Sequence, residues 1–277
     1  MPDVSSAAPA ERNAGVVDSV NRAGAAVLAA PVLLSAMAWA YLALLPPSGV
    51  ARGVLARGYA MHRPIPTGEL SLMDVSGWAA SLPWFALMWA VVVVAMMFPV
   101  VAPDVVVFDQ WRRSHGRSFV TPVAFAAGYL VVWAVLGVFV FAAIVALDVE
   151  INSASTAVRV GSAVLLAAGA YQLTRLKLAC LARAQSPLGL IDEHGDEIMR
   201  HGFRGALQVG LWHGGWSLGC WSGLMAVLVA LGVLHLGWMA AVMIVMLAEK
   251  FLPGGPVVPR TVGGVLLVAG ATLMMTA

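Results

Sequence analysis

The sequence predicts an all-α integral membrane protein, a polytopic bundle of about seven transmembrane helices. Of the 277 residues, 61% are hydrophobic and only 11% are charged, whereas about a quarter of the residues in soluble globular domains are charged. The apolar residues also fall into stretches of about 20 residues, the length that a helix needs to cross a bilayer. The net charge of +2 gives no basis for nucleic-acid binding. We therefore expect the lipid bilayer to surround most of the chain.

Seven apolar stretches follow a polar tail over residues 1–23, which we expect to be retained because it lacks the basic start and apolar core of a cleaved signal peptide. They form a single transmembrane domain over residues 24–277. The first stretch ends before Pro46, and the segment from there to Ser81 is the only long external connection, with part of it expected in the membrane interface. The predicted spans are 24–45, 82–101, 121–147, 157–178, 206–234, 237–252 and 257–276.

Basic residues gather on the side of the tail and of the second, fourth and sixth connections. Because cytoplasmic loops of membrane proteins are rich in Lys and Arg, this bias predicts a cytoplasmic N-terminus. With an odd number of spans the C-terminus is then external, in a multi-pass protein of the bacterial cytoplasmic (inner) membrane. Acidic and basic residues interleave in the connection over residues 179–205, which is expected to be a short amphipathic helix on the membrane surface.

The second span carries two methionines close to two prolines. Pro99 and Pro103 are expected to break the helix near its cytoplasmic end and to free backbone carbonyls, such as that of Ala95. The thioether sulfurs of Met96 and Met97 are soft ligands that suit Cu(I), and freed carbonyls would serve a harder ion. Packing is the alternative explanation, since methionine also fills irregular gaps between helices.

His213, Ser217 and Cys220 in the fifth span are four and then three residues apart, so they share one helical face. An ionisable residue inside a membrane is a functional candidate by default. The alternative is that His213 bonds to a neighbouring helix and that Cys220 is a small apolar filler. Four glycines would let neighbouring backbones approach this helix closely: Gly210, Gly214, Gly215 and Gly219.

One stripe along the sixth span consists of His235, Met239, Met243, Met246 and Lys250. This spacing favours a packing face over a path for a cofactor. Glu249 and Lys250 end the span, where snorkelling to the water boundary explains them, although Glu249 could instead pair with a basic residue across the bundle.

No phosphate-binding glycine loop, no GxSxG elbow and no HExxH motif occurs in the sequence. An acid, base and nucleophile set is also missing, so we name no catalytic residue and favour a protein that is not an enzyme. With only Cys180 and Cys220, a disulfide framework is not expected.

Four blocks, in this order, resemble a bacterial family of predicted metal-binding integral membrane proteins, a domain of unknown function. They read MWAVVVVAMMFPVVAP from Met88, YQLTRLKLACLARAQSPLG from Tyr171, GLWHGGWSLGCWSGLM from Gly210 and WMAAVMIVMLAEKFLPGG from Trp238. The resemblance covers the chain from the second span to its end.

Compared with that family, this chain has lost cysteines. Ser217 and Trp221 stand where the family tends to have cysteine, and so does Ala184 after Cys180. The resemblance therefore implies mixed ligands from different helices rather than a cage of thiolates, in a site suited to passage or delivery. The implied metal ligands are His213, Cys220, Met96, Met97 and Met88, with Asp104, Ser217 and Glu249 as possible supporting residues.

Two functions follow as hypotheses. The first is a protein that binds a soft transition-metal ion and moves or delivers it, with copper favoured by the ligands and zinc as the alternative. The second is a non-catalytic structural or assembly subunit of a larger complex, whose Met and Trp surfaces pack against other membrane-protein subunits.

Overall fold

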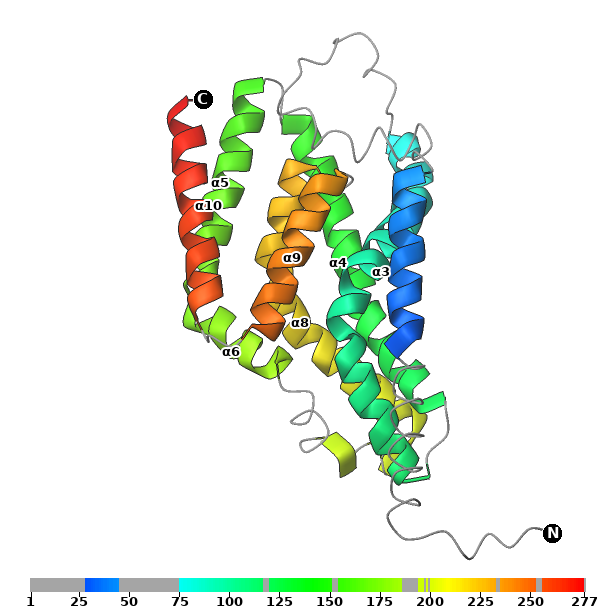
Figure 1. The fold of residues 1–277 in the computed structure, drawn as a ribbon. Helices are drawn as coiled ribbons and strands as arrows, with labels where there is room; N and C mark the ends of the chain where they lie inside the picture. The colour runs from blue at the N-terminus through cyan, green and yellow to red at the C-terminus, as the bar shows by residue number, and fades with distance from the viewer. Residues whose placement is uncertain are drawn as a thin grey trace, which may run out of the picture.

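The computed structural model describes residues 28–44, 75–116, 120–150, 154–185, 194–196, 198, 200–232, 235–252 and 256–276. All the regular secondary structure in these ranges is helical, which confirms the predicted all-α class (Figure 1). The polar tail and most of the connection before Ser81 lie outside the described residues. The helices are Leu28–Leu44, α3 (Val75–Ser114), α4 (Val120–Glu150), α5 (Ala154–Gln172), α6 (Arg175–Ala184), α8 (Phe203–Leu231), α9 (Leu236–Phe251) and α10 (Val257–Thr276).

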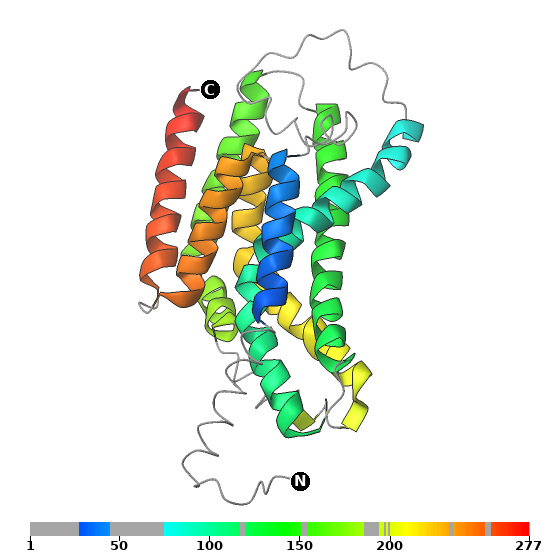
Figure 2. The ribbon, with the colours of Figure 1, turned by 45° about the vertical axis from the view of Figure 1, so that its right-hand side comes forward.

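The core of the bundle lies around α8. One large buried cluster takes side chains from α3, α4, α6, α8 and α9, while α5 pairs with α10 along one side of the molecule (Figures 1 and 2). Close backbone approach explains the tight α4–α8 pair, since a Cβ atom on Gly210 would lie 2.1 Å from the carbonyl oxygen of Phe125. Three of the four predicted glycines, Gly210, Gly214 and Gly219, meet another helix in this way, whereas Gly215 faces open space.

The outer faces of the bundle are apolar. On α10, Val265 and Val268 are more than half exposed, and Leu33, Met37 and Leu44 are equally exposed on the helix Leu28–Leu44. Water would solvate such surfaces poorly, whereas lipid suits them. The helices thus identify a multi-pass membrane protein.

Four described helical segments are long and apolar enough to cross a membrane: Phe85–Ser114, Val120–Ala143, Phe203–Leu231 and Val257–Thr276. The bent pair Ser155–Gln172 and Arg175–Ala184 raises the number to five. The predicted number of seven is therefore wrong for the described part of the chain. One reason is that α9 has 16 residues, which reach about 24 Å against a hydrocarbon core of about 30 Å. The helix Leu28–Leu44 is likewise apolar but too short to count among these spans.

The prolines of α3 do not interrupt it. The helix runs unbroken through Pro83, Pro99 and Pro103, so the expected break near the cytoplasmic end is wrong. Pro99 nevertheless cannot donate to Ala95, one turn earlier. The carbonyl of Ala95 instead accepts hydrogen bonds from Ser35 Oγ at 2.6 Å and Trp39 Nε1 at 3.1 Å. The helix Leu28–Leu44 thereby donates to the carbonyl that Pro99 leaves without a helical hydrogen bond.

A break does occur between α5 and α6, inside the predicted fourth span, where the two axes turn by 69°. Thr174 caps the new helix, because its Oγ1 accepts from the backbone N–H of Lys177 at 3.1 Å. The bend carries α6 into the bundle, where Lys177, Cys180 and Leu181 are buried. The expected surface helix over residues 179–205 is therefore wrong for residues 179–184, and residues 186–193 lie outside the described part.

Candidate functional site

The polar face of α8 points into the core. His213, Ser217 and Cys220 are all buried, with exposed fractions of 5%, 0% and 1%. The three side chains, which the sequence places on one face, therefore share one interior. Each of them contacts a different set of residues on the surrounding helices.

His213 belongs to a group that links α3, α8 and α9. Lys250 Nζ donates to Asp104 Oδ2 at 2.5 Å, and His213 Nε2 lies 3.6 Å from the same oxygen. The other carboxylate oxygen, Asp104 Oδ1, is buried and has no hydrogen-bond partner among the described residues. The group therefore holds a carboxylate with one oxygen still able to accept a donor or a cation.

Ser217 lies between the two ends of the face. Its hydroxyl and that of Tyr129 on α4 form a hydrogen bond of 3.0 Å. The ring of Tyr129 is also 6.0 Å from the ring of His213, centroid to centroid. Tyr129 thus connects the histidine to the middle of the face.

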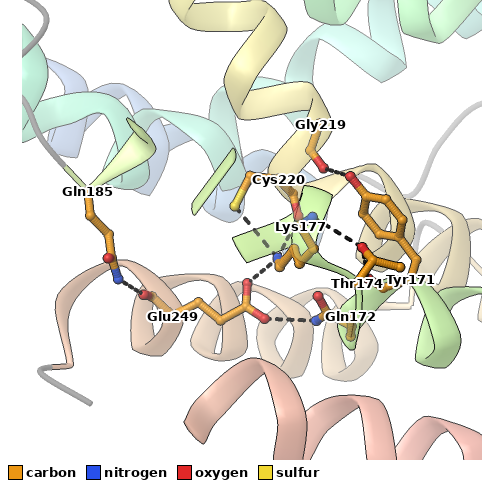
Figure 3. A network of polar contacts seen from close by, with 8 residues as sticks. All are labelled: Tyr171, Gln172, Thr174, Lys177, Gln185, Gly219, Cys220 and Glu249. Carbon is orange, nitrogen blue, oxygen red and sulfur yellow. Dashed lines mark hydrogen bonds and ion pairs between the residues drawn. The ribbon is translucent and has the colours of Figure 1, made fainter. Parts of the chain in front are cut away.

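Cys220 belongs to a second group, which links α6, α8 and α9 (Figure 3). The fully buried Lys177 Nζ donates to the carbonyl of Cys220 at 2.5 Å and to Glu249 Oε2 at 2.7 Å, and it lies 3.6 Å from Cys220 Sγ. An ammonium group has three donors. All three of them therefore have an acceptor within the bundle.

Glu249 is the centre of this second group. Its Oε1 accepts from Gln172 Nε2 at 2.8 Å while Oε2 accepts from Lys177, and its backbone carbonyl accepts from Gln185 Nε2 at 2.6 Å. Nearby, the hydroxyl of Tyr171 donates to the carbonyl of Gly219 (Figure 3). The carboxylate is thus neutralised and fully hydrogen-bonded, as a charge buried in a membrane protein requires.

Snorkelling is the wrong explanation for Glu249 and Lys250. Both are buried, and both form ion pairs, Glu249 with Lys177 and Lys250 with Asp104. Neighbouring residues of a helix point about 100° apart, so α9 reaches one partner on each side. The structure instead favours the alternative that Glu249 pairs with a basic residue across the bundle.

The three candidate methionines of α3 are also buried. Met96 and Met97 have no exposed surface and Met88 has 6%, and they share one core with Cys220. On α9, Met239 and Met246 are equally buried, in agreement with a packing face. The interior beside α8 is therefore rich in sulfur as well as in polar groups.

These residues do not form one ready metal cage. Among the described residues, no three His, Cys, Asp or Glu side chains gather closely enough to hold an ion together. Along α8, His213 and Cys220 are seven residues apart, a rise of about 10 Å. One ion is too small to bind both, because metal–ligand bonds are about 2.0–2.3 Å long. The expected ligands thus fall into a histidine end and a cysteine end.

Sequence reasoning missed Lys177 as a member of this site. Lys177 stands at the end of the predicted span 157–178, where a basic residue is expected near the cytoplasmic side of the membrane. A signal was present, since Glu249 stands at the matching end of another predicted span, and two opposite charges at similar depth can pair. The bend before α6, which brings the pair together, was not visible in the hydropathy.

A family model described as "PpoB2: Copper chaperone" matches residues 86–273. No curated protein and no solved structure matches the chain. The matched region contains α4 to α9 entirely, most of α3 and α10, and every residue of the two polar groups. The description also names copper, a metal that soft sulfur side chains favour. Since the match covers more than half of the 277 residues, the chain belongs to the PpoB2 copper chaperone family.

Proposed function

We propose that this protein binds Cu(I) in the interior of its helical bundle and delivers it to another protein. The observation that carries the proposal is the copper chaperone family match, which contains the buried face of α8 with His213 and Cys220. Copper is the cargo of such a protein. The chain therefore needs ligands that hold the ion and then release it.

The proposed ligands are His213 and Cys220 on α8, together with the thioethers of Met96, Met97 and Met88 on α3. Thiolate and thioether sulfur select Cu(I), and imidazole also binds copper. Because the histidine and the cysteine stand about 10 Å apart along the helix, we place them as successive positions for one ion. Such a series of weak positions favours transfer over storage.

Asp104, Ser217 and Glu249 have supporting roles in this proposal. Asp104 accepts at 2.5 Å from Lys250 and faces His213, so it can fix the orientation of the imidazole as outer-sphere carboxylates do. Glu249 neutralises the ammonium group that contacts Cys220. Ser217 bonds to Tyr129 between the two positions. None of the three has to bind the ion itself.

The basic end of the bundle is proposed to face the cytoplasm of a bacterial cell. Arg112 and Arg113 end α3, Arg183 lies in α6 and Arg204 begins α8, and these segments lie toward the lower end in Figure 1. The C-terminal end of α10 lies at the opposite end. A reporter fused after the last residue should therefore lie outside the cytoplasm. A reporter found inside the cytoplasm would contradict this orientation.

The test of copper binding uses the full chain, purified in mild detergent without oxygen. Cu(I) is offered in competition with a coloured Cu(I) chelator. The wild type is expected to take one Cu(I) from the chelator, and the double variant His213→Ala/Cys220→Ser to take none. The variant Met96→Leu, which removes a buried thioether, should bind Cu(I) more weakly than the wild type. Its matched control is Met275→Leu at an exposed methionine near the end of α10, which should bind as the wild type does.

Two results would overturn the proposal. One is a wild type that leaves all Cu(I) on the chelator. The other is a double variant that competes as well as the wild type. A parallel titration with Zn(II) compares the two metals, and tighter binding of zinc than of Cu(I) would reject copper as the cargo.

A further inference from the structure

Cys180 lies beside the cysteine end of the proposed copper path. It follows Lys177 by three residues on α6, so the two side chains share one helical face. A Cβ atom built on Gly219 would lie 2.8 Å from Cys180 Sγ. Since Gly219 is the residue before Cys220, the thiol of Cys180 lies directly against the turn of α8 that carries Cys220.

Both cysteines are buried and neither is in a disulfide. Cys220 Sγ contacts the ammonium group of Lys177 at 3.6 Å, whereas no hydrogen bond to the thiol of Cys180 is found among the described residues. Lys177 therefore shares a face of α6 with Cys180, and its ammonium group contacts the sulfur of Cys220. Two sulfurs and one cationic group therefore lie where α6 packs against α8.

We propose that Cys180 and Cys220 together bind one Cu(I) at the contact between α6 and α8, with Lys177 beside the site. This inference rests on the proposed function and names the ligand set at its cysteine end. Thiolates are the form of cysteine that binds metals, and soft sulfur ligands select Cu(I). One Cu(I) on two thiolates carries a net charge of −1, and the ammonium group of Lys177 lies where it can oppose that charge.

Cys180 and Cys220 come from different helices, and the 69° bend between α5 and α6 is what brings α6 against α8. A tetrahedral site needs about four ligands, which this contact does not offer. The geometry therefore favours an ion that accepts two sulfurs, and it disfavours zinc.

Cys180→Ser is the test, with Cys180→Ala as the second variant if a buried hydroxyl prevents folding. Size-exclusion chromatography in detergent checks that the variant is folded. We expect Cu(I) affinity, measured against the coloured chelator, to fall at least tenfold. X-ray absorption of the Cu(I)-loaded protein should count one sulfur fewer than in the wild type.

A folded Cys180 variant with wild-type affinity and the wild-type number of sulfurs would overturn the two-cysteine site. If the double variant at His213 and Cys220 still loses copper in that case, the proposed function stands and only this inference fails. If the wild type takes no Cu(I) at all, the proposed function and the inference fail together. Loss of one sulfur in both the Cys180 and the Cys220 variants supports the pair.

Discussion

The buried ion pair between Lys177 and Glu249 allows a quantitative test of the bundle's interior. Their charged atoms are 2.7 Å apart and both side chains have no exposed surface. At an effective dielectric constant of about 20, two unit charges at this distance attract by about 6 kcal/mol. Desolvation offsets much of this attraction, but removing only one partner of a buried pair leaves an uncompensated charge and costs about 3–5 kcal/mol.

We therefore expect Lys177→Met to lower the free energy of unfolding by about 3–5 kcal/mol. Glu249 keeps its hydrogen bond from Gln172 at 2.8 Å, which stabilises the carboxylate only in part. In the double variant Lys177→Met/Glu249→Gln both charges are gone and the amide at 249 can still bond to Gln172. Most of the lost stability, all but about 1–2 kcal/mol, should then return.

The assay is unfolding by sodium dodecyl sulfate titrated into detergent micelles, followed by the fluorescence of the ten tryptophans. Arg113→Met is the matched control, because its pair with Asp109 is equally short at 2.6 Å but the arginine is 49% exposed. Asp109 is buried but keeps its second partner, Arg112, at 2.5 Å, so the loss of the half-exposed Arg113 should cost about 0–1 kcal/mol. If Lys177→Met costs no more than this control, or if the double variant is no more stable than the single one, the reasoning is refuted.

Two further predictions concern packing and the second ion pair. Gly210→Ala places a Cβ against the backbone oxygen of Phe125, which cannot move aside, so it should cost about 2–3 kcal/mol or more in the same assay. Gly215→Ala meets nothing within 4 Å and should stabilise by up to about 1 kcal/mol through helix propensity; equal losses in both variants would contradict the contact. Lys250→Met should lower the free energy of unfolding by about 3–5 kcal/mol, because it leaves Asp104 without its ion-pair partner. Lys250→Arg should recover part of that loss. If Lys250→Met leaves the stability unchanged, the ion pair is not formed.

The sequence allowed the helical class and several helix positions to be predicted. Long apolar runs specify helices in lipid, and α9 and α10 begin and end within one residue of the predicted sixth and seventh spans. Hydropathy carries little information on bends. Nothing in the run 157–178 marks the point where Gln172 ends one helix and Thr174 caps the next. The residues before that turn bond to other helices, Tyr171 to Gly219 on α8 and Gln172 to Glu249 on α9.

The common face of His213, Ser217 and Cys220 followed from helical spacing alone, and the structure buries it. Their separate partners could not be predicted in the same way. Whether Glu249 reaches water or Lys177 depends on how α9 and α6 meet, and periodicity within one helix does not encode the distance to another. The metal roles of these residues remain predictions for the copper titration.

The two ion pairs also constrain how copper can enter. Glu249 and Lys250 are neighbours on α9, and each is already neutralised by a partner, so the interior described here holds balanced charges. A cation that enters must therefore displace a charge or bind where negative charge can form, because an unpaired charge inside the bundle is costly. Cysteine sulfur meets this condition, because a cysteine that binds a metal gives up its proton and so supplies a negative charge. The cysteine end of α8 can therefore take up a cation without leaving an unpaired positive charge beside Lys177, and sulfur as the ligand selects the soft ion Cu(I).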